Sequence, residues 1–162
     1  MEALDMKFKI NYLEPRVNVL IRYNPREYSF DYSASGIGIT DASLLINDLE
    51  LAIDTQTNIV YGVSGFNCHL EWVKADVSFP NAENGRLLVC DKLDSGDVFR
   101  IKSGWTTYYD CSKKCICFGK KDLGDCKSVR FGNNIVASIE NDDIVALWIQ
   151  FTDDTYLPGF SC

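Results

Sequence analysis

The sequence predicts a mainly β protein: a single-domain antiparallel sheet, sandwich- or barrel-like in form, with at most one or two short helices. Two observations support this prediction. Apolar and polar residues alternate with a period of two along much of the chain, and Asn, Asp, Gly and Pro interrupt the alternation at short intervals. No long segment has the 3.6-residue period of an amphipathic helix. Short strands punctuated by turns are typical of a sandwich, a barrel or a strongly bent sheet.

The chain length favours one domain that covers residues 1–162. Domains usually contain about 100–200 residues. Hydrophobic residues make up 46% of the chain and charged residues 24%, which is ordinary for a globular protein. No Pro/Ser-rich linker and no block of like charges divides the sequence. We therefore expect one hydrophobic core that needs neither metals nor disulfides.

In the first part of the chain, the alternation predicts strands at residues 6–12, 17–22, 28–33, 49–53 and 59–63. Residues 54–58 are rich in turn formers, so the last two strands should form a hairpin. Residues 41–46 fit two interpretations. Asp41 is a good N-cap for a helical turn, but the same residues also suit the front of a strand.

In the second part, a run at 70–79 ends at Pro80, and Asn84-Gly85 is a tight-turn signal before a strand at 86–90. The remaining predicted strands lie at residues 98–102, 105–109, 115–118, 128–131, 135–140 and 144–151.

The net charge of -7 constrains the kind of partner. An anionic surface repels phosphate backbones and anionic lipids, so we expect no direct nucleic-acid binding and no membrane binding. A basic protein partner would be attracted. The start of the chain carries Glu2 and Asp5 where a signal peptide has bases, and no long apolar run follows. These features predict a cytoplasmic protein.

No recognisable catalytic motif is present, so we do not expect an enzyme. The single histidine, His69, would have to serve any Ser-His-Asp or Cys-His system. Its neighbour Cys68 would point to the opposite face of a strand. His69 and Glu71 form a His-x-Glu pair as in zinc deaminases, but the Pro-Cys-x-x-Cys that those enzymes also need is missing.

Four of the seven cysteines cluster in the sequence, at Cys111, Cys115, Cys117 and Cys126. Four thiolates could hold a structural zinc, but the usual pair of knuckles is absent. The alternative is a set of small, partly buried free thiols that pack as hydrophobic residues. We expect no metal and no cofactor.

The candidate partner-binding residues are Asp91, Asp94, Asp97, Tyr108 and Tyr109. Acids concentrate in this part of the chain, where few bases accompany them. Tyr108 and Tyr109 are adjacent on a predicted strand and must face opposite ways, so one of them should be exposed. An exposed Tyr beside acids is typical of a binding surface.

The run Gly132-Asn-Asn-Ile-Val-Ala-Ser-Ile-Glu-Asn-Asp-Asp-Ile-Val-Ala-Leu-Trp-Ile149 resembles the terminal hairpin of small bacterial immunity proteins. These proteins accompany secreted polymorphic toxins, including those of contact-dependent growth inhibition. The resemblance implies a cytosolic inhibitor that occludes one cognate toxin domain. Many such toxins are nucleases, which are basic because they grip phosphate, and an acidic inhibitor would gain association rate by steering.

Two other functional classes stay open. A small carboxylate-dependent enzyme would need a pair of facing acids, such as Asp91 and Asp94. A β-rich ligand-binding module would use its aromatic residues to line a groove.

Overall fold

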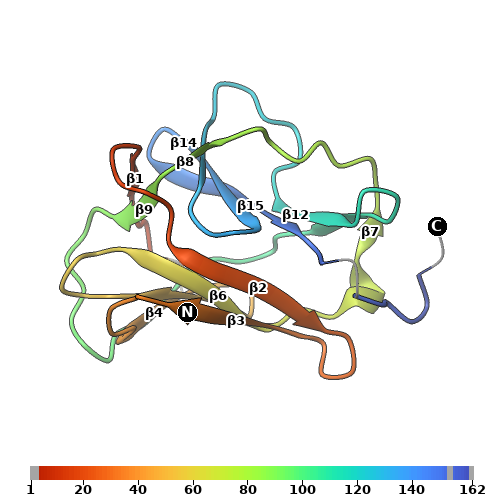
Figure 1. Cartoon of the computed structure of the whole chain (residues 1–162), viewed down its shortest axis with the longest axis horizontal. Helices are drawn as coiled ribbons and strands as arrows, with labels where there is room; N and C mark the ends of the chain where they lie inside the picture. Colours follow the sequence, from red (N-terminus) through yellow and green to blue (C-terminus); the bar gives the residue numbers. More distant parts are fainter. Residues whose placement is uncertain (1–3, 153–154, 161–162) are drawn as a thin grey trace.

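The computed structural model describes residues 4–152 and 155–160, and most of its strands stack as two large sheets (Figure 1). One sheet has six strands in the order β10-β4-β5-β6-β3-β2. The other has seven in the order β7-β11-β12-β15-β14-β13-β8. Strands β1 (Phe8–Asn11) and β9 (Arg86–Val89) pair as a separate ribbon. The predicted mainly β fold is confirmed, and neither large sheet closes into a barrel within the described residues.

The six-stranded sheet is mostly antiparallel, as predicted. Its strands are β2 (Asn18–Asn24), β3 (Ser29–Ser35), β4 (Ala42–Ile46), β5 (Leu49–Ile53), β6 (Val60–Phe66) and β10 (Val98–Lys102). The residues that fitted either a helical turn or a strand thus form β4. Strand β10 is an exception to the antiparallel pattern, because it pairs in parallel with β4.

The seven-stranded sheet has a long antiparallel centre and two short edge strands. Its strands are β7 (Val73–Lys74), β8 (Glu83–Asn84), β11 (Thr107–Asp110), β12 (Cys115–Gly119), β13 (Lys127–Arg130), β14 (Ile135–Glu140) and β15 (Asp143–Gln150). Both edge strands pair in parallel with their neighbours. The predicted hairpin of β14 and β15 is confirmed. Its turn residues Asn141 and Asp142 have φ angles of 51° and 64°, as a two-residue primed turn requires.

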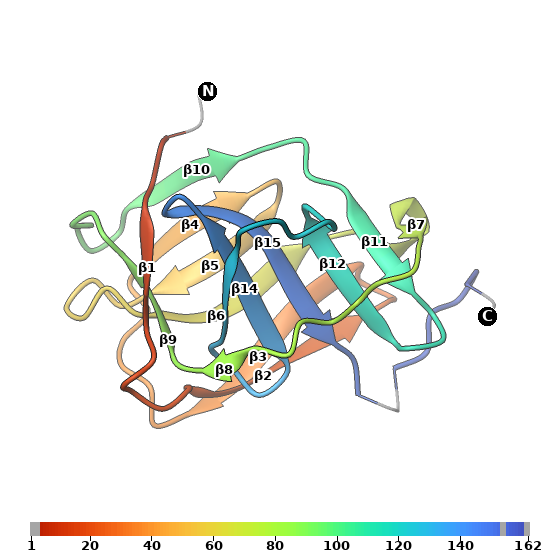
Figure 2. The same ribbon diagram turned by 90° about the horizontal axis from the view of Figure 1, so that it is seen from above.

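The prediction of one strand over residues 70–79 is wrong. The segment instead begins with a short 3-10 helix, η1 (His69–Glu71), followed by the two residues of β7. It then crosses the outer face of the seven-stranded sheet as an irregular strap toward β8 (Figures 1 and 2). The alternation of Val77 and Phe79 reflects packing of this strap on the sheet rather than pairing within it. No helix in the described residues is long and apolar enough to cross a membrane.

The tight turn predicted at Asn84-Gly85 does not join two paired strands. Strands β8 and β9 belong to different sheets, so the chain passes from one sheet to another at Gly85. A Cβ atom at Gly85 would lie 2.8 Å from the carbonyl oxygen of Asn11. A glycine is needed there because the backbone of the neighbouring segment approaches so closely.

Two apolar clusters are buried in the part of the chain that the structure describes. The main core draws its buried side chains from both large sheets and from the ribbon of β1 and β9. A second, smaller core lies under the strap, where Val77 packs against Cys115, Cys117 and Trp148. Ile116 and Phe118 of the same strand belong to the main core. Cys115 and Cys117 therefore share one face of β12, and Ile116 lies on the other.

Asn134 joins the free edge of β2 to the end of β15. Its side-chain oxygen accepts a hydrogen bond from the backbone nitrogen of Ile21 at 2.8 Å. Its amide nitrogen donates to the carbonyl oxygen of Ile21 at 2.8 Å and to that of Gln150 at 2.7 Å. The side chain thus acts as a one-residue extension of the sheet and ties the two layers together.

Candidate functional site

Two neighbouring hollows lie on either side of Trp105, in the connection between β10 and β11. The first has a volume of about 300 Å³ and the second about 340 Å³, and both are lined by Trp105 and Thr106. We call them together the Trp105 groove. The first hollow is also lined by Asn47, Asp48, Phe66, Asn67, Glu71 and Trp72. The second is also lined by Lys102, Tyr108, Gly119, Lys120 and Asp143.

Asn47 fixes the backbone of Trp105. It occupies the turn between β4 and β5 with a φ of 51°, a left-handed conformation that asparagine tolerates well. Its side-chain nitrogen donates to the carbonyl oxygen of Trp105 at 2.8 Å, and the Trp105 backbone nitrogen donates to its side-chain oxygen at 3.1 Å. The Asn47 backbone nitrogen donates to the carbonyl oxygen of Lys102 at 3.0 Å. The loop between β10 and β11 is therefore clamped to the β4–β5 turn of the six-stranded sheet.

Gly119 leaves the space that the indole of Trp105 occupies. A Cβ atom at Gly119 would lie 2.9 Å from the indole ring and 2.5 Å from the carbonyl oxygen of Val145. The φ of +116° is also one that side chains other than glycine rarely adopt. The indole packs edge-on against Phe118, with ring centroids 5.1 Å apart. Trp105 is consequently held as a fixed partition between the two hollows.

The far wall of the first hollow is rigid and its rim is apolar. The indole nitrogen of Trp72 donates to the side-chain oxygen of Asn67. The amide nitrogen of Asn67 donates to the hydroxyl of Thr107 at 3.1 Å. Phe66, by contrast, is 51% exposed, and Val73 in the same lining is exposed too. Exposed apolar side chains beside a fixed polar wall are typical of a binding surface.

The two hollows differ in charge. The described lining of the first hollow contains the carboxylates of Asp48 and Glu71 and no Lys or Arg. The nearest cation that pairs with either is Arg100, whose guanidinium lies 3.8 Å from the Asp48 carboxylate. In the second hollow, Lys102 forms an ion pair with Asp143 at 2.8 Å. The first hollow is therefore the more acidic of the two.

The structure does not bring the predicted acids together with the tyrosines. Asp91, Asp94 and Asp97 lie in the loop between β9 and β10, and Figure 2 shows this loop at the opposite end of the sandwich from β11. The carboxylate of Asp97 accepts a hydrogen bond from the backbone nitrogen of Asp94 at 2.8 Å, so it stabilises the turn. Asp91 and Asp94 are exposed.

Tyr108 and Tyr109 face opposite sides of β11, as predicted. Tyr108 is half-buried and lines the second hollow, where Lys121 lies 5.6 Å from the centre of its ring. Tyr109 is only 7% exposed. Its ring packs in the main core against Phe160 and Trp72, with centroids 5.2 and 5.6 Å away. The choice of Tyr109 as a surface residue is therefore wrong, because core packing covers it.

The groove residues that sequence reasoning missed are Phe66, Trp105, Asp48 and Glu71. Trp105 was assigned to a strand, whereas β11 begins at Thr107 and Trp105 lies in the preceding loop. The signal that could have located it is Gly104, a turn-forming residue directly before the tryptophan in the sequence. In the structure Gly104 has a φ of 73°, as in a turn. A large aromatic residue just after a turn is less constrained to the core than one inside a strand.

His69 is a structural residue in this fold. It is 2% exposed. Its Nε2 atom lies 2.9 Å from the carbonyl oxygen of Pro158, which can only accept, so Nε2 carries the proton of this bond. Its backbone nitrogen donates to the Tyr23 hydroxyl at 2.9 Å. His69 thus anchors the C-terminal segment to the sandwich.

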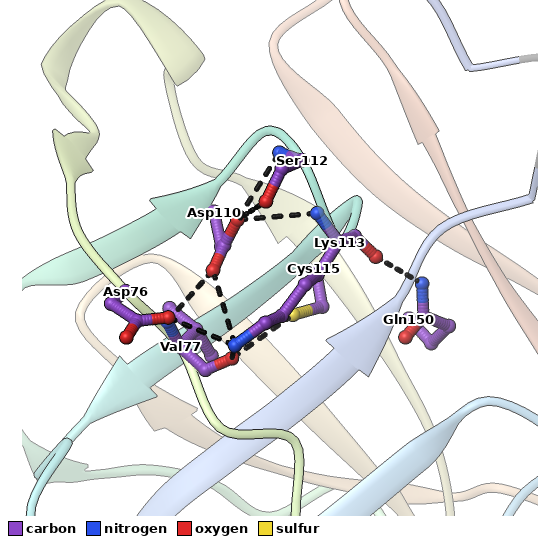
Figure 3. Close-up of polar contacts among 7 residues, drawn as sticks. All are labelled: Asp76, Val77, Asp110, Ser112, Lys113, Cys115 and Gln150. Carbon is purple, nitrogen blue, oxygen red and sulfur yellow. Dashed lines mark hydrogen bonds and ion pairs between the residues drawn. The ribbon is translucent and has the colours of Figure 1, made fainter. Parts of the chain in front are cut away.

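The carboxylate with the strongest pKa shift, Asp110, is also structural (Figure 3). It accepts hydrogen bonds from the backbone nitrogen of Val77 at 3.0 Å and from the hydroxyl of Ser112 at 2.8 Å. The bond from Val77 is the largest cause that lowers the pKa of Asp110 to about 2. Lys113 lies 3.7 Å from Asp110 and 2.8 Å from Asp76. This cluster fastens the strap to the hairpin of β11 and β12.

The clustered cysteines do not converge on one point. Cys115 and Cys117 are buried in the second core, where burial raises the pKa of the Cys117 thiol to about 12. The Cys126 thiol instead donates to the carboxylate of Glu140 at 3.5 Å. Among the residues that the structure describes, no group of three or more His, Cys, Asp or Glu is placed to hold a metal ion. Six cysteines in this part of the chain are free thiols, and Cys162 lies outside it.

A search with protein-family models and a search of curated protein sequences each found no match to this chain.

Proposed function

We propose that this chain is a binding protein of the bacterial cytoplasm that neutralises a cognate toxin domain, as an immunity protein of a contact-dependent inhibition system does. The partner is a basic domain, for instance a nuclease. The observation that carries the proposal is the Trp105 groove, where a fixed tryptophan and an exposed Phe66 adjoin two carboxylates. Fixed aromatic anchors beside charged groups are typical of the centre of protein–protein interfaces.

The first hollow suits a lysine or arginine side chain of the partner. Its aliphatic stem would lie between Phe66 and Trp105, and its cationic end would reach Asp48 or Glu71. A cation over an aromatic ring gains about 0.5–2 kcal/mol, more when water is excluded. The carboxylates at the rim would attract the basic partner before contact is made. The carboxylates would thus speed association, and the aromatic residues would hold the partner once it is bound.

The carboxyl groups of Asp41, Asp110 and Glu140 do not suit a general acid at neutral pH. A general acid at neutral pH needs a raised pKa. Hydrogen bonds lower the pKa values of Asp41, Asp110 and Glu140, which stabilises their charged forms. Asp91 and Asp94, the pair considered for a carboxylate enzyme, are exposed on a loop.

The test is a kinetic binding measurement with the toxin domain encoded by the adjacent reading frame. We expect Trp105→Ala to raise the dissociation rate, because it removes the anchor. Asp48→Lys should slow association, and raising the salt from 0.01 M to 0.1 M should do the same, since the Debye length falls from about 30 Å to about 10 Å. Asp91→Lys, at the other end of the sandwich, is the matched control.

Two results would contradict the proposal in different ways. Absence of binding at low salt would refute the toxin partner. Tight binding that Trp105→Ala and Asp48→Lys leave unchanged, but that Asp91→Lys weakens, would move the interface to the loop after β9.

A further inference from the structure

Another cavity, of about 360 Å³, lies away from the Trp105 groove. It is lined by Pro15, Arg16, Asn18, Asn84 and Asn133. These residues come from the segment that enters β2, from β8, and from the turn between β13 and β14. In Figure 2, β8 lies at the lower edge of the molecule, whereas the connection between β10 and β11 crosses the top.

Arg16 orients the amide side chains around the cavity. Its Nε atom donates to the side-chain oxygen of Asn133 at 3.3 Å, and its Nη1 atom donates to the side-chain oxygen of Asn84 at 3.2 Å. The amide nitrogen of Asn133 in turn donates to the side-chain oxygen of Asn18 at 2.8 Å. Because a guanidinium can only donate, the two asparagines must present their oxygens to it. The orientation of all three amides therefore follows from the arginine.

This relay uses the amide oxygens and leaves N–H groups available. The side-chain oxygens of Asn18, Asn84 and Asn133 each already accept one bond. The Nη2 group of Arg16 and the amide nitrogen of Asn84 donate to no described residue. Asn18 uses one amide hydrogen, toward Ser35 at 2.7 Å, and keeps the other. A lining that offers several unused N–H groups suits a ligand that accepts hydrogen bonds.

The positive charge beside this cavity has no carboxylate partner among the described residues. Arg16 and Arg130 take part in none of the ion pairs there. Arg130 lies behind Asn133 and donates from Nε to its carbonyl oxygen at 3.1 Å. Burial and the charge of Arg16 both lower the pKa of Arg130. Two guanidinium groups thus act on one small region, although the whole chain is acidic.

We propose that this cavity binds a tetrahedral oxyanion, the phosphate or sulfate group of a small ligand, through Arg16 and Asn84. An oxyanion accepts from several directions at once, which suits donors that come from three separate segments. The negative charge would also relieve the repulsion between Arg16 and Arg130. This site is independent of the proposed toxin binding, since it shares no residue with the Trp105 groove.

Inorganic phosphate is the first probe, added at low ionic strength while the Arg Nε–H and Asn side-chain signals are followed by nuclear magnetic resonance. We expect saturable shifts for Arg16, Asn84 and Asn18. Arg16→Gln should weaken binding at least about tenfold, because it removes a charge-assisted donor. Asn84→Asp should abolish binding, because the substitution removes the two N–H groups of the amide. The new carboxylate would also form an ion pair with Arg16 in place of the ligand. Arg26→Gln removes the same charge at an exposed turn and should leave binding unchanged.

Parallel titrations with sulfate and acetate identify the ligand class. Sulfate should compete with phosphate, whereas acetate should bind more weakly. Unsaturable shifts, equal weakening by Arg26→Gln and Arg16→Gln, or binding that survives Asn84→Asp would each overturn the proposal. Unchanged spectra away from the cavity show that a variant is folded, and if Arg16→Gln perturbs them, Asn84→Asp decides the outcome.

Discussion

Replacing Asn134 with alanine should destabilise the protein more than any ordinary surface substitution. The residue is 9% exposed and its side chain makes three hydrogen bonds, two to Ile21 and one to Gln150. These bonds join the edge of one large sheet to the end of the other. Their loss also leaves the backbone nitrogen of Ile21 without its partner in a region that water does not reach.

The size of the effect follows from these groups. A hydrogen bond contributes about 1 kcal/mol net, and a buried donor left unsatisfied costs about 1–3 kcal/mol. Three lost bonds and one orphaned N–H therefore sum to about 4–6 kcal/mol in the free energy of unfolding. Domains of this kind have total stabilities of about 5–15 kcal/mol. The variant should consequently unfold at a much lower urea concentration.

Urea denaturation followed by tryptophan fluorescence measures this change. Asn81→Ala is the matched control, because Asn81 is an exposed asparagine in the strap, and it should change the stability by less than about 0.5 kcal/mol. Asn134→Asp should be at least as damaging as alanine, since a carboxylate would face two carbonyl oxygens. A loss below about 1 kcal/mol for Asn134→Ala, with an unchanged dependence on urea, would refute the reasoning.

Two further predictions concern titratable groups. The pKa of Asp110 lies at about 2, below its ordinary value of 3.8, so its carboxylate stabilises the fold fully above about pH 4 and loses that contribution as the pH falls toward 2. Asp110→Asn should therefore lower stability at neutral pH and flatten its pH dependence between about pH 4 and pH 2, with Asp91→Asn as the surface control; a parallel pH profile would contradict this. Burial raises the pKa of the Cys115 thiol to about 11, whereas Cys90 is exposed. Alkylation of the native protein at about pH 8, read by mass spectrometry, should modify Cys90 first and Cys115 only after unfolding; equal rates would show that the second core opens.

The strands could be predicted because period-two alternation survives wherever a strand has one buried face. Residues 49–53, 98–102 and 135–140 have the predicted bounds. The same rule failed at 70–79, because Val77 and Phe79 alternate while packing on the outside of a sheet. Alternation reports which side chains are buried; it does not report hydrogen-bonded pairing.

The candidate site could be predicted only in part. Tyr108 was found because two adjacent tyrosines on a strand must separate to opposite faces. The density of acids along the chain suggested Asp91, Asp94 and Asp97. Although these residues are close to the tyrosines in the sequence, the fold places them on a loop far from β11. The groove itself is assembled from segments far apart in the chain, which include residues 47, 66 and 105. No local pattern encodes such a meeting, since it depends on the stacking of two sheets.

The asparagines explain why so much of this arrangement is hidden in the sequence. Asparagine is a common turn former, and Asn47 does form a turn, with its backbone in the left-handed conformation. Yet the carboxamide also reproduces the donor and acceptor of a peptide bond. Asn47 uses both to pair with the backbone of Trp105, and Asn134 uses both to pair with Ile21. A side chain that makes the hydrogen bonds of a neighbouring strand can hold an irregular loop as firmly as a sheet edge. Asn47 holds the loop that carries Trp105 in this way, so the tryptophan is fixed although it lies in a connection between two strands.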